Sequence, residues 1–304
     1  MIEQLNARID ALFRDHRRGA AEIVQDAVEL FVSIAQLATE SPMSAEHLFD
    51  RAIRRLAKGQ PTMAPVLNLL NRVCHAREES NDDWEKFAES VVALAERRRD
   101  LSEEMKRRLI ELPPADTLIL FSNSSTVAKL ALSAHLQFGW PRRVYCGEGR
   151  PVMEGLVLAQ KLTMAGLDVT LFTDAALMSR VVEADSVWVG GDSLSHEGLV
   201  NKVGSRALAM LCRFQMTPFV SMIGTDKFLA RAMMPYFGFL PQNPREIGGD
   251  ESDTLNVHNE YYETIPLDLV DLILTENGVF DPTSLVGSIG EEPVSPLFAK
   301  LLQC

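Results

Sequence analysis

The chain has 304 residues, of which 46% are hydrophobic and 24% are charged, and its formal net charge is −12. This length and composition predict a globular protein of two domains that can bury its cores without disulfides or metals. The acidic balance argues against general binding to nucleic acid or to an anionic membrane. We therefore expect no membrane partner and no direct nucleic-acid partner.

The four cysteines are widely spaced and form no CxxC pair, which argues against a zinc site, a redox motif or a disulfide framework. The first 18 residues are charged throughout and lack the apolar stretch of a signal peptide. No run approaches the ~20 apolar residues of a membrane span. These features predict a cytoplasmic protein.

Residues 1–112 show apolar residues at helical spacing and no convincing strand, which predicts an all-helical domain of four to six helices. The periodic blocks are Ile9–Phe13, Ile23–Ile34, Leu48–Leu56, Ala64–Arg77 and Trp84–Leu112. Pro113 and Pro114 then end the helical pattern. We place the domain boundary here, giving domains 1–112 and 113–304.

Short apolar runs alternate with helical stretches after this boundary, which predicts βαβ units and a parallel α/β sheet. The expected strands are Thr117–Phe121, Arg143–Cys146, Asp168–Phe172, Ser186–Gly190, Pro218–Met222 and Leu272–Thr275. Parallel strands end at one edge of the sheet, and ligands of open α/β sheets bind there.

Polar clusters follow the first two strands. Ser122, Asn123 and Ser124 form a hydroxyl-rich turn that opens a helix, so this turn is either a simple N-cap or an anion site. Arg150 offers a donor fork for phosphate, and Glu148 can pair with it or accept sugar hydroxyls. A surface loop with a local ion pair is the alternative for this second cluster.

The fourth and fifth strands are followed by further candidates. Asp192 suits proton transfer or hydroxyl binding, or it is a structural aspartate. Asn201, Lys202 and Ser205 lie around an expected helix start, which is a favourable place for phosphate, although Ser205 alone can be a cap. Lys227 follows the fifth strand, and in isolation an exposed lysine is the simpler interpretation.

These clusters, in this order, match a known family over nearly the whole chain. The chain resembles the alpha, beta and delta subunits of eukaryotic translation initiation factor 2B, whose family includes methylthioribose-1-phosphate isomerase and ribose-1,5-bisphosphate isomerase. The matching segments are Arg18-Gly19-Ala20, Pro61-Thr62, Glu148-Gly149-Arg150-Pro151, Glu154-Gly155, Gly190-Gly191-Asp192, Asn201-Lys202-Val203-Gly204-Ser205, Lys227-Phe228, Asn259, Pro266 and Thr275-Glu276-Asn277-Gly278-Val279.

The resemblance implies a helical N-terminal domain and a Rossmann-like C-terminal domain of the NagB/RpiA/CoA-transferase type. It implies dimerisation through the C-terminal domain, with higher oligomers left open, and an inter-domain pocket for a sugar phosphate or nucleotide-like phosphate. We expect no cofactor and no metal. On this ground Arg18, Gly19 and Ala20 become phosphate-side candidates, and Asp192 corresponds to the acid of the isomerases.

One departure from the family pattern bears on catalysis. The isomerases carry a cysteine after their first Rossmann strand, in a Thr-His-Cys-Asn stretch, whereas this chain has Asn123 at that position and Ser122 in place of the histidine. A carboxamide cannot act as a titrating thiol. Gln60 also replaces the family's arginine before Pro-Thr. Cys146 is a weaker substitute for the missing thiol, or a buried small hydrophobe.

Three functions remain open at this point. We favour a non-catalytic member that resembles the initiation factor subunits and binds a phosphorylated ligand. The alternative is an aldose–ketose isomerase of a phosphorylated pentose, with Asp192 doing the proton transfer. In the third, the chain is an assembly subunit, and residues 84–112 form a contact face for a partner. These residues include a run of charges over 96–108. A solvated helix face explains the same pattern.

Overall fold

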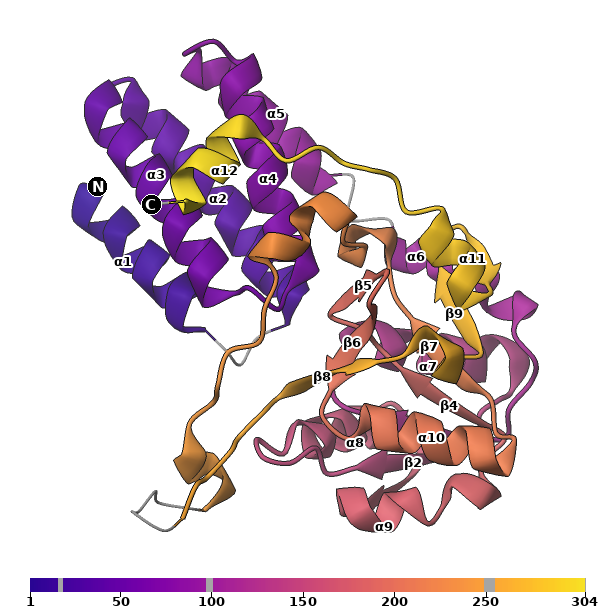
Figure 1. Ribbon diagram of the computed structural model, residues 1–304. Coiled ribbons are helices and arrows are strands. Elements are labelled where there is room, and N and C mark those ends of the chain that lie inside the picture. Colours follow the sequence, from indigo (N-terminus) through magenta and orange to yellow (C-terminus); the bar gives the residue numbers. More distant parts are fainter. Residues whose placement is uncertain (16–18, 97–100, 249–254, 304) are drawn as a thin grey trace. The chain divides into compact units, whose positions relative to one another are not determined.

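The computed structural model of the protein describes residues 1–304 apart from 16–18, 97–100, 249–254 and 304 (Figure 1). The chain forms two compact units, the first from residues 1–100, 226–238 and 290–304, and the second from residues 101–225 and 239–289. Each unit is thus assembled from stretches far apart in the sequence. Residues 101–112 pack with the second unit, whereas 226–238 and 290–304 pack with the first.

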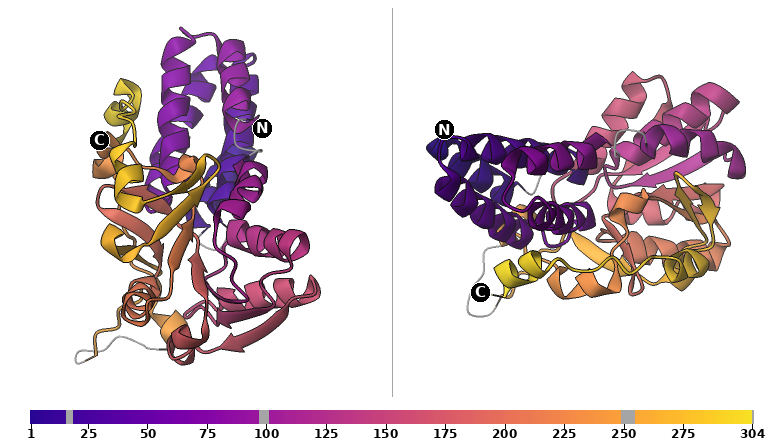
Figure 2. Two further views of the ribbon diagram at one scale, coloured as in Figure 1. Left: turned by 90° about the vertical axis from the view of Figure 1, so that its right-hand side faces the viewer. Right: turned by 90° about the horizontal axis from the view of Figure 1, so that it is seen from above.

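The first unit is built of helices, as the periodicity predicted. Its main helices are α1 (Ile2–Arg14), α2 (Ala20–Ala38), α3 (Pro42–Gly59), α4 (Ala64–Glu79) and α5 (Trp84–Glu96). On α2, Ile23, Leu30 and Ile34 are fully buried, because spacings of seven and four residues, close to two turns and one turn, place them on one face of the helix. The C-terminal helix α12 (Pro296–Leu302) packs against α3 and α4 and adds Phe298 to this core (Figure 2).

The second unit contains a seven-stranded sheet in the order β10-β9-β7-β4-β1-β2-β3. Its strands are β1 (Thr117–Phe121), β2 (Arg143–Gly147), β3 (Asp168–Phe172), β4 (Ser186–Val189), β7 (Phe219–Met222), β9 (Leu272–Thr275) and β10 (Gly278–Phe280). All neighbours pair in parallel except β9 with β10. The predicted parallel α/β architecture is confirmed, and β10 is an antiparallel edge strand that the sequence did not reveal.

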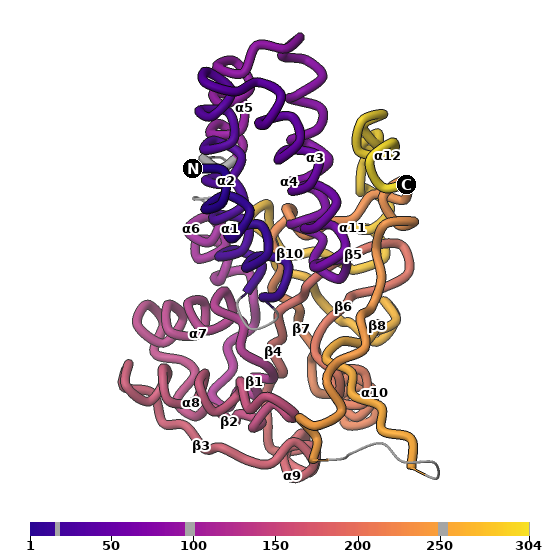
Figure 3. Tube along the Cα trace, turned by 90° about the vertical axis from the view of Figure 1, so that its left-hand side faces the viewer, coloured from indigo at the N-terminus to yellow at the C-terminus, as the bar shows by residue number. Residues whose placement is uncertain are grey.

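Helices cover both faces of this sheet, which explains why its central strands are apolar on both sides. Leu118, Leu120 and Cys146 belong to the core shared with α6 (Leu101–Arg108), α7 (Ser125–Phe138) and α8 (Glu154–Met164). The helices α9 (Asp174–Met178) and α10 (Ser205–Gln215) lie on the opposite face. Figure 3 shows α7 and α8 on one side of β1 and β4, and α10 on the other.

A second, smaller sheet was not expected from the sequence. It joins β5 (Ser193–Ser195), β6 (Gly198–Lys202) and β8 (Tyr262–Ile265) in antiparallel pairs. Lys202 lies directly opposite Tyr262 across the β6–β8 pair. Lys202 therefore ends a strand, and the following helix α10 begins three residues later, at Ser205.

Short 3-10 turns connect these elements. They are η1 (Leu109–Glu111), η2 (Val181–Glu183), η3 (Thr225–Lys227), η4 (Arg231–Tyr236), η5 (Pro244–Ile247) and η6 (Leu267–Leu269), and a short helix α11 (Pro282–Gly287) follows the last strand. None of the helices within the described part of the chain is long and apolar enough to cross a membrane.

Candidate functional site

The C-terminal edge of the parallel strands collects most of the predicted site residues. The loops after β1, β2 and β4 carry Ser122, Arg150 and Asp192 respectively. Because β2 and β4 flank β1 in parallel, these three loops leave the sheet at the same edge. All of them belong to the second unit.

A buried ion pair lies beside Ser122 at this edge of the sheet. The ammonium of Lys202 lies 2.8 Å from Glu154 Oε1, with the two side chains only 5% and 19% exposed. The same ammonium lies 5.0 Å from the ring centre of Tyr261, which adds a cation–π contact. A buried charge pair of this kind is costly to form, and removal of one partner is strongly destabilising because the other charge stays buried.

Glu154 was not among the predicted ligand-binding residues, although it belongs to a matching segment of the family. It is the first residue of α8, and its Oε1 also accepts a 3.4 Å hydrogen bond from the hydroxyl of Ser122. Burial raises the pKa of Glu154, while Lys202 acts in the opposite direction. Its second oxygen, Oε2, is buried and has no hydrogen-bond partner among the other residues that the structure describes, while the backbone N–H of Glu154 itself acts to lower the pKa of this carboxyl.

The turn after β1 contains the N-cap that is one of the two interpretations made from the sequence. Ser124 is the N-cap of α7, and its hydroxyl accepts from the backbone N–H of Val127 at 3.3 Å. Ser122 has a left-handed backbone (φ 71°), which is uncommon for a residue other than glycine and is typical of functional turns. Ser122 therefore contacts the ion pair, whereas Ser124 stabilises the helix start.

The loop after β2 is held by a carboxylate from α9. Asp174 accepts the backbone N–H groups of Gly149 at 2.9 Å and Arg150 at 2.7 Å. Gly155 allows the loop to approach α8, because a Cβ there would lie 1.8 Å from the carbonyl oxygen of Gly147. The Arg150 side chain is exposed, and Glu148 is half-buried.

Two glycines let the loop after β4 pack closely against Ser124 and Ile223. A Cβ at Gly190 would lie 2.8 Å from the Ser124 hydroxyl, and one at Gly191 would lie 2.7 Å from Ile223. Asp192 follows, half-buried, and its backbone N–H donates to Val200 at 2.8 Å. Burial raises the pKa of the Tyr262 phenol, and the nearby Asp192 and Glu154 carboxylates raise it further. Asp192 and Glu154 thus both lie close enough to act on one tyrosine.

The phosphate site expected at the start of α10 is occupied by the chain itself. Glu263 Oε1 accepts the backbone N–H groups of Gly204 at 2.6 Å and Arg206 at 2.9 Å. Asn201 donates to the Ser205 hydroxyl at 3.0 Å, within the protein interior. A carboxylate at a helix N-terminus satisfies the same donors that a phosphate would use. Within this cluster Lys202, at the end of β6, faces Glu154 rather than the helix start.

The remaining predicted residues are distributed elsewhere. Gly19 caps α2 through its carbonyl, Ala20 is buried at the start of that helix, and Lys227 ends η3; all three belong to the first unit. Arg18 lies outside the described residues. Gln60, which replaces the family's arginine, is buried and donates to the carbonyls of Leu12 and Asp15 at 2.9 and 2.7 Å.

Cys146 lies in the apolar core of the sheet with no exposed surface. Burial raises the pKa of its thiol to about 12. A thiol in this state carries almost no thiolate at neutral pH, and the thiolate is the reactive form. This environment is the one expected of a small buried hydrophobe rather than of a proton-transfer group.

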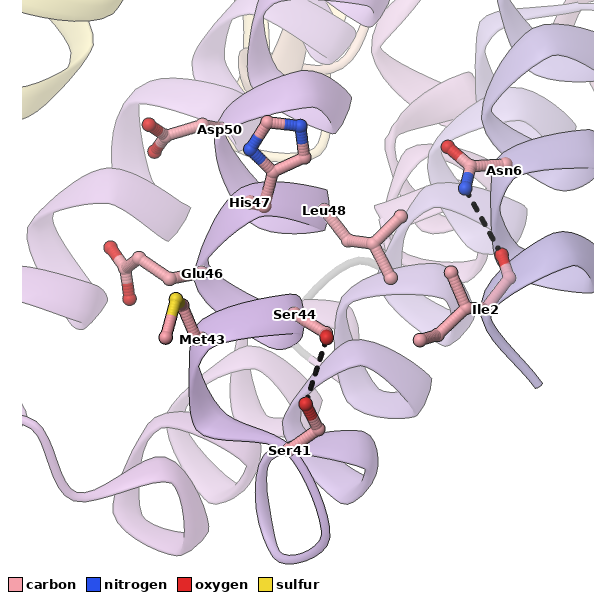
Figure 4. A pocket seen from close by; sticks show the side chains of 9 residues that line it. All are labelled: Ile2, Asn6, Ser41, Met43, Ser44, Glu46, His47, Leu48 and Asp50. Atoms are coloured by element: carbon pink, nitrogen blue, oxygen red, sulfur yellow. Dashed lines mark hydrogen bonds between the residues drawn. The ribbon is translucent and has the colours of Figure 1, made fainter.

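The first unit also contains a surface hollow of about 610 Å³ beside the starts of α1 and α3 (Figure 4). Its lining includes Glu46, His47 and Asp50, together with the apolar Met43 and Leu48. Burial, followed by the charge of Glu46, raises the pKa of Asp50. None of the sequence-predicted site residues lines this hollow.

The order of these motifs along the chain agrees with a protein-family model that matches most of the sequence. The model described as the initiation factor 2 subunit family matches residues 16–282. The chain belongs to this family. The similarity that the motifs indicated is thereby confirmed over most of the length.

The relatives of this family member include isomerases and initiation factors. A ribose 1,5-bisphosphate isomerase of Archaeoglobus fulgidus is 29% identical over 277 residues, covering 87% of this chain and 86% of that protein. A 5-deoxyribose 1-phosphate isomerase of Moorella thermoacetica is 28% identical, with 90% and 85% covered. The solved Pyrococcus horikoshii translation initiation factor eIF-2B has the same fold, with a TM-score of 0.79, 23% identity and coverage of 93% and 99%.

Proposed function

We propose that this family member is an aldose–ketose isomerase of a phosphorylated pentose. The relatives named as pentose-phosphate isomerases support this function better than the non-catalytic binding that we favoured from the sequence. The observation that carries the proposal is the buried Lys202–Glu154 pair at the sheet edge, beside Ser122, with the Glu154 and Asp192 carboxylates both raising the pKa of Tyr262. A site of this kind combines a cation with carboxylates that can move protons.

An aldose–ketose isomerisation would give each of these side chains a role. Aldose–ketose isomerisation moves one hydrogen from C2 to C1 and needs a group that takes a proton from the sugar. Asp192 is the candidate for this role, because it follows a buried central strand at the sheet edge. The exposed Arg150 is suited to a substrate phosphate. Asn123 offers an amide donor to a sugar oxygen, in place of a thiol.

One observation favours the second candidate, a non-catalytic protein that binds the same class of ligand. Asn123 cannot titrate, and Cys146 is buried with a high pKa, so neither supplies the thiol that the resemblance associates with the isomerases. Turnover, rather than binding, separates the two candidates.

The test is direct. The protein is incubated with ribose 1,5-bisphosphate, 5-deoxyribose 1-phosphate or 5-methylthioribose 1-phosphate, and proton NMR follows the new C1 methylene signals of a ketose. An isomerase converts at least one of them, and Asp192→Asn abolishes that conversion. Thermal stabilisation by these compounds without any ketose would establish the non-catalytic function instead, and neither response would refute both.

We further propose that the protein forms a homodimer through the C-terminal domain. Support comes from exposed apolar side chains on and directly after α10: Met210, Phe214 and Met216 are 57%, 80% and 90% exposed. Met210 and Phe214 are four residues apart and share one face of the helix. Large exposed apolar side chains that gather on one face are typical of an interaction surface.

A further inference from the structure

The two oxygens of the Glu154 carboxylate have different surroundings. Oε1 accepts hydrogen bonds from Lys202 Nζ at 2.8 Å and Ser122 Oγ at 3.4 Å. Oε2 is buried, and no other described residue donates to it. A buried carboxylate oxygen without a donor is costly, so its retention at the sheet edge indicates that a ligand supplies the missing partner or that the oxygen itself carries a proton.

We propose that Glu154 is the second proton-transfer residue of the isomerisation, acting through Oε2 on a sugar oxygen. This inference rests on the proposed function and names a residue that works with Asp192. Lys202 and Ser122 are positioning residues, because they hold Oε1 and thereby orient Oε2.

The reaction needs two such groups when the substrate is a pentose 1-phosphate. The C1–O4 ring bond breaks, its electron pair goes to O4, and Glu154 gives O4 a proton. The hydrogen on C2 moves with its electron pair to C1, and the O2–H proton passes to Asp192 as the C2=O bond forms. One proton is given and one is taken, C1 is reduced and C2 is oxidised, so no outside oxidant or reductant is required.

The surroundings of Glu154 suit a proton donor. The groups that face it are Lys202 on β6, Ser122 after β1 and the Tyr262 phenol on β8. Burial raises the pKa of Glu154, and Lys202 limits that increase. Asn123 has no proton that it can exchange in this pH range, whereas Glu154 is a carboxyl at this sheet edge, in contact with Lys202 and Ser122.

A structural role for Glu154, as the counter-ion of Lys202 alone, makes a different prediction. Glu154→Gln keeps the side-chain size and a carbonyl oxygen for the Lys202 ammonium, but it cannot transfer a proton. If Glu154 transfers protons, kcat falls by about 10²–10⁴-fold while the substrate dissociation constant, measured by calorimetry, changes less than about fivefold. Glu197→Gln, on the exposed β5–β6 turn, is the matched control and keeps the wild-type kcat.

Two further measurements keep the inference falsifiable if Glu154→Gln folds poorly. The kcat of the unaltered protein should fall on the alkaline side as Glu154 loses its proton. Lys202→Met should move this alkaline limb to higher pH, because removal of a neighbouring cation favours the protonated carboxyl. If kcat does not fall at alkaline pH, or if its alkaline fall in Lys202→Met occurs at the same pH as in the unaltered protein, the role of Glu154 is overturned.

The outcomes also separate this inference from the proposed function. If the unaltered protein isomerises a pentose phosphate and Glu154→Gln does so at the same rate, the isomerase function stands and the role of Glu154 is overturned. If the unaltered protein converts none of the three pentose 1-phosphates, both proposals fall together.

Discussion

The carboxylate of Asp174 holds the backbone of Arg150 by a 2.7 Å hydrogen bond. Its other oxygen accepts the N–H of Gly149 at 2.9 Å, so one side chain on α9 fixes the loop that follows β2. That loop carries the guanidinium that we assign to a substrate phosphate. The relationship predicts that a residue which never touches the ligand affects ligand affinity.

Asp174→Ala should therefore weaken phosphate binding and lower stability together. The two N–H groups lose their acceptor, which costs about 1–3 kcal/mol in the free energy of unfolding. Chemical denaturation measures the loss, and calorimetry with a pentose phosphate measures the affinity. Asp168→Ala, at the exposed start of β3, is the control, and equal affinity in Asp174→Ala and the control would contradict the assignment.

The pH dependence of the free energy of unfolding should reveal the raised pKa of the Glu154 carboxyl. Burial raises its pKa in the folded protein above the ordinary value of about 4.3, so the folded state holds its proton more tightly than the unfolded state. This contribution to stability is fully present below the ordinary pKa and is lost as the pH rises through the folded pKa.

The free energy of unfolding of the unaltered protein, minus that of Glu154→Gln, should accordingly fall as the pH rises from about 4. Urea unfolding at a series of pH values measures this difference, and the other titrating groups cancel because both proteins share them. A difference that grows with pH would show that the Lys202 charge outweighs burial.

The buried thiols should resist alkylation in the native state. Burial raises the pKa of both Cys146 and Cys212 to about 12, and it raises that of Cys74 as well. In a Cys304→Ala background, we expect iodoacetamide at pH 8 to label these three cysteines only after unfolding, as mass spectrometry would show.

Replacement of Cys146 tests its part in catalysis. Cys146→Ser places a hydroxyl in an apolar site, so the free energy of unfolding should fall by about 1–3 kcal/mol while turnover stays within about twofold. Cys146→Ala, which introduces no polar atom, is the companion variant. A loss of turnover in both, with the fold intact by circular dichroism, would assign the thiol a catalytic role.

The exposed face of α10 should control self-association. Phe214→Asp places a charge on this apolar face and should raise the dimer dissociation constant by at least about tenfold, measured by analytical ultracentrifugation. Leu136→Asp on α7 is the control, because Leu136 is 73% exposed on another helix. A dimer that is unaffected by Phe214→Asp would place the interface elsewhere.

Local pattern was enough to predict the six parallel strands of the main sheet and its main helices. The run Thr117–Phe121 is apolar throughout, because a parallel strand covered by helices on both faces is buried on both faces. The spacing of Ile23, Leu30 and Ile34 predicted α2 for a similar reason, since apolar residues at helical spacing mark the face of a helix that is buried in the core. The family motifs then indicated the loops in which we propose the functional residues.

Tertiary structure alone decided the contacts within the site. Glu154 and Lys202 are 48 positions apart in the sequence, and Gly204 and Glu263 are 59 apart, so no periodicity connects them. The antiparallel pairing of β6 with β8 likewise depends on the path of the chain between them. The neighbours of a residue in sequence determine its local conformation. Whether a carboxylate pairs with an ammonium, as Glu154 does, or with the N–H groups of a helix start, as Glu263 does, depends on which distant segments the fold places beside it.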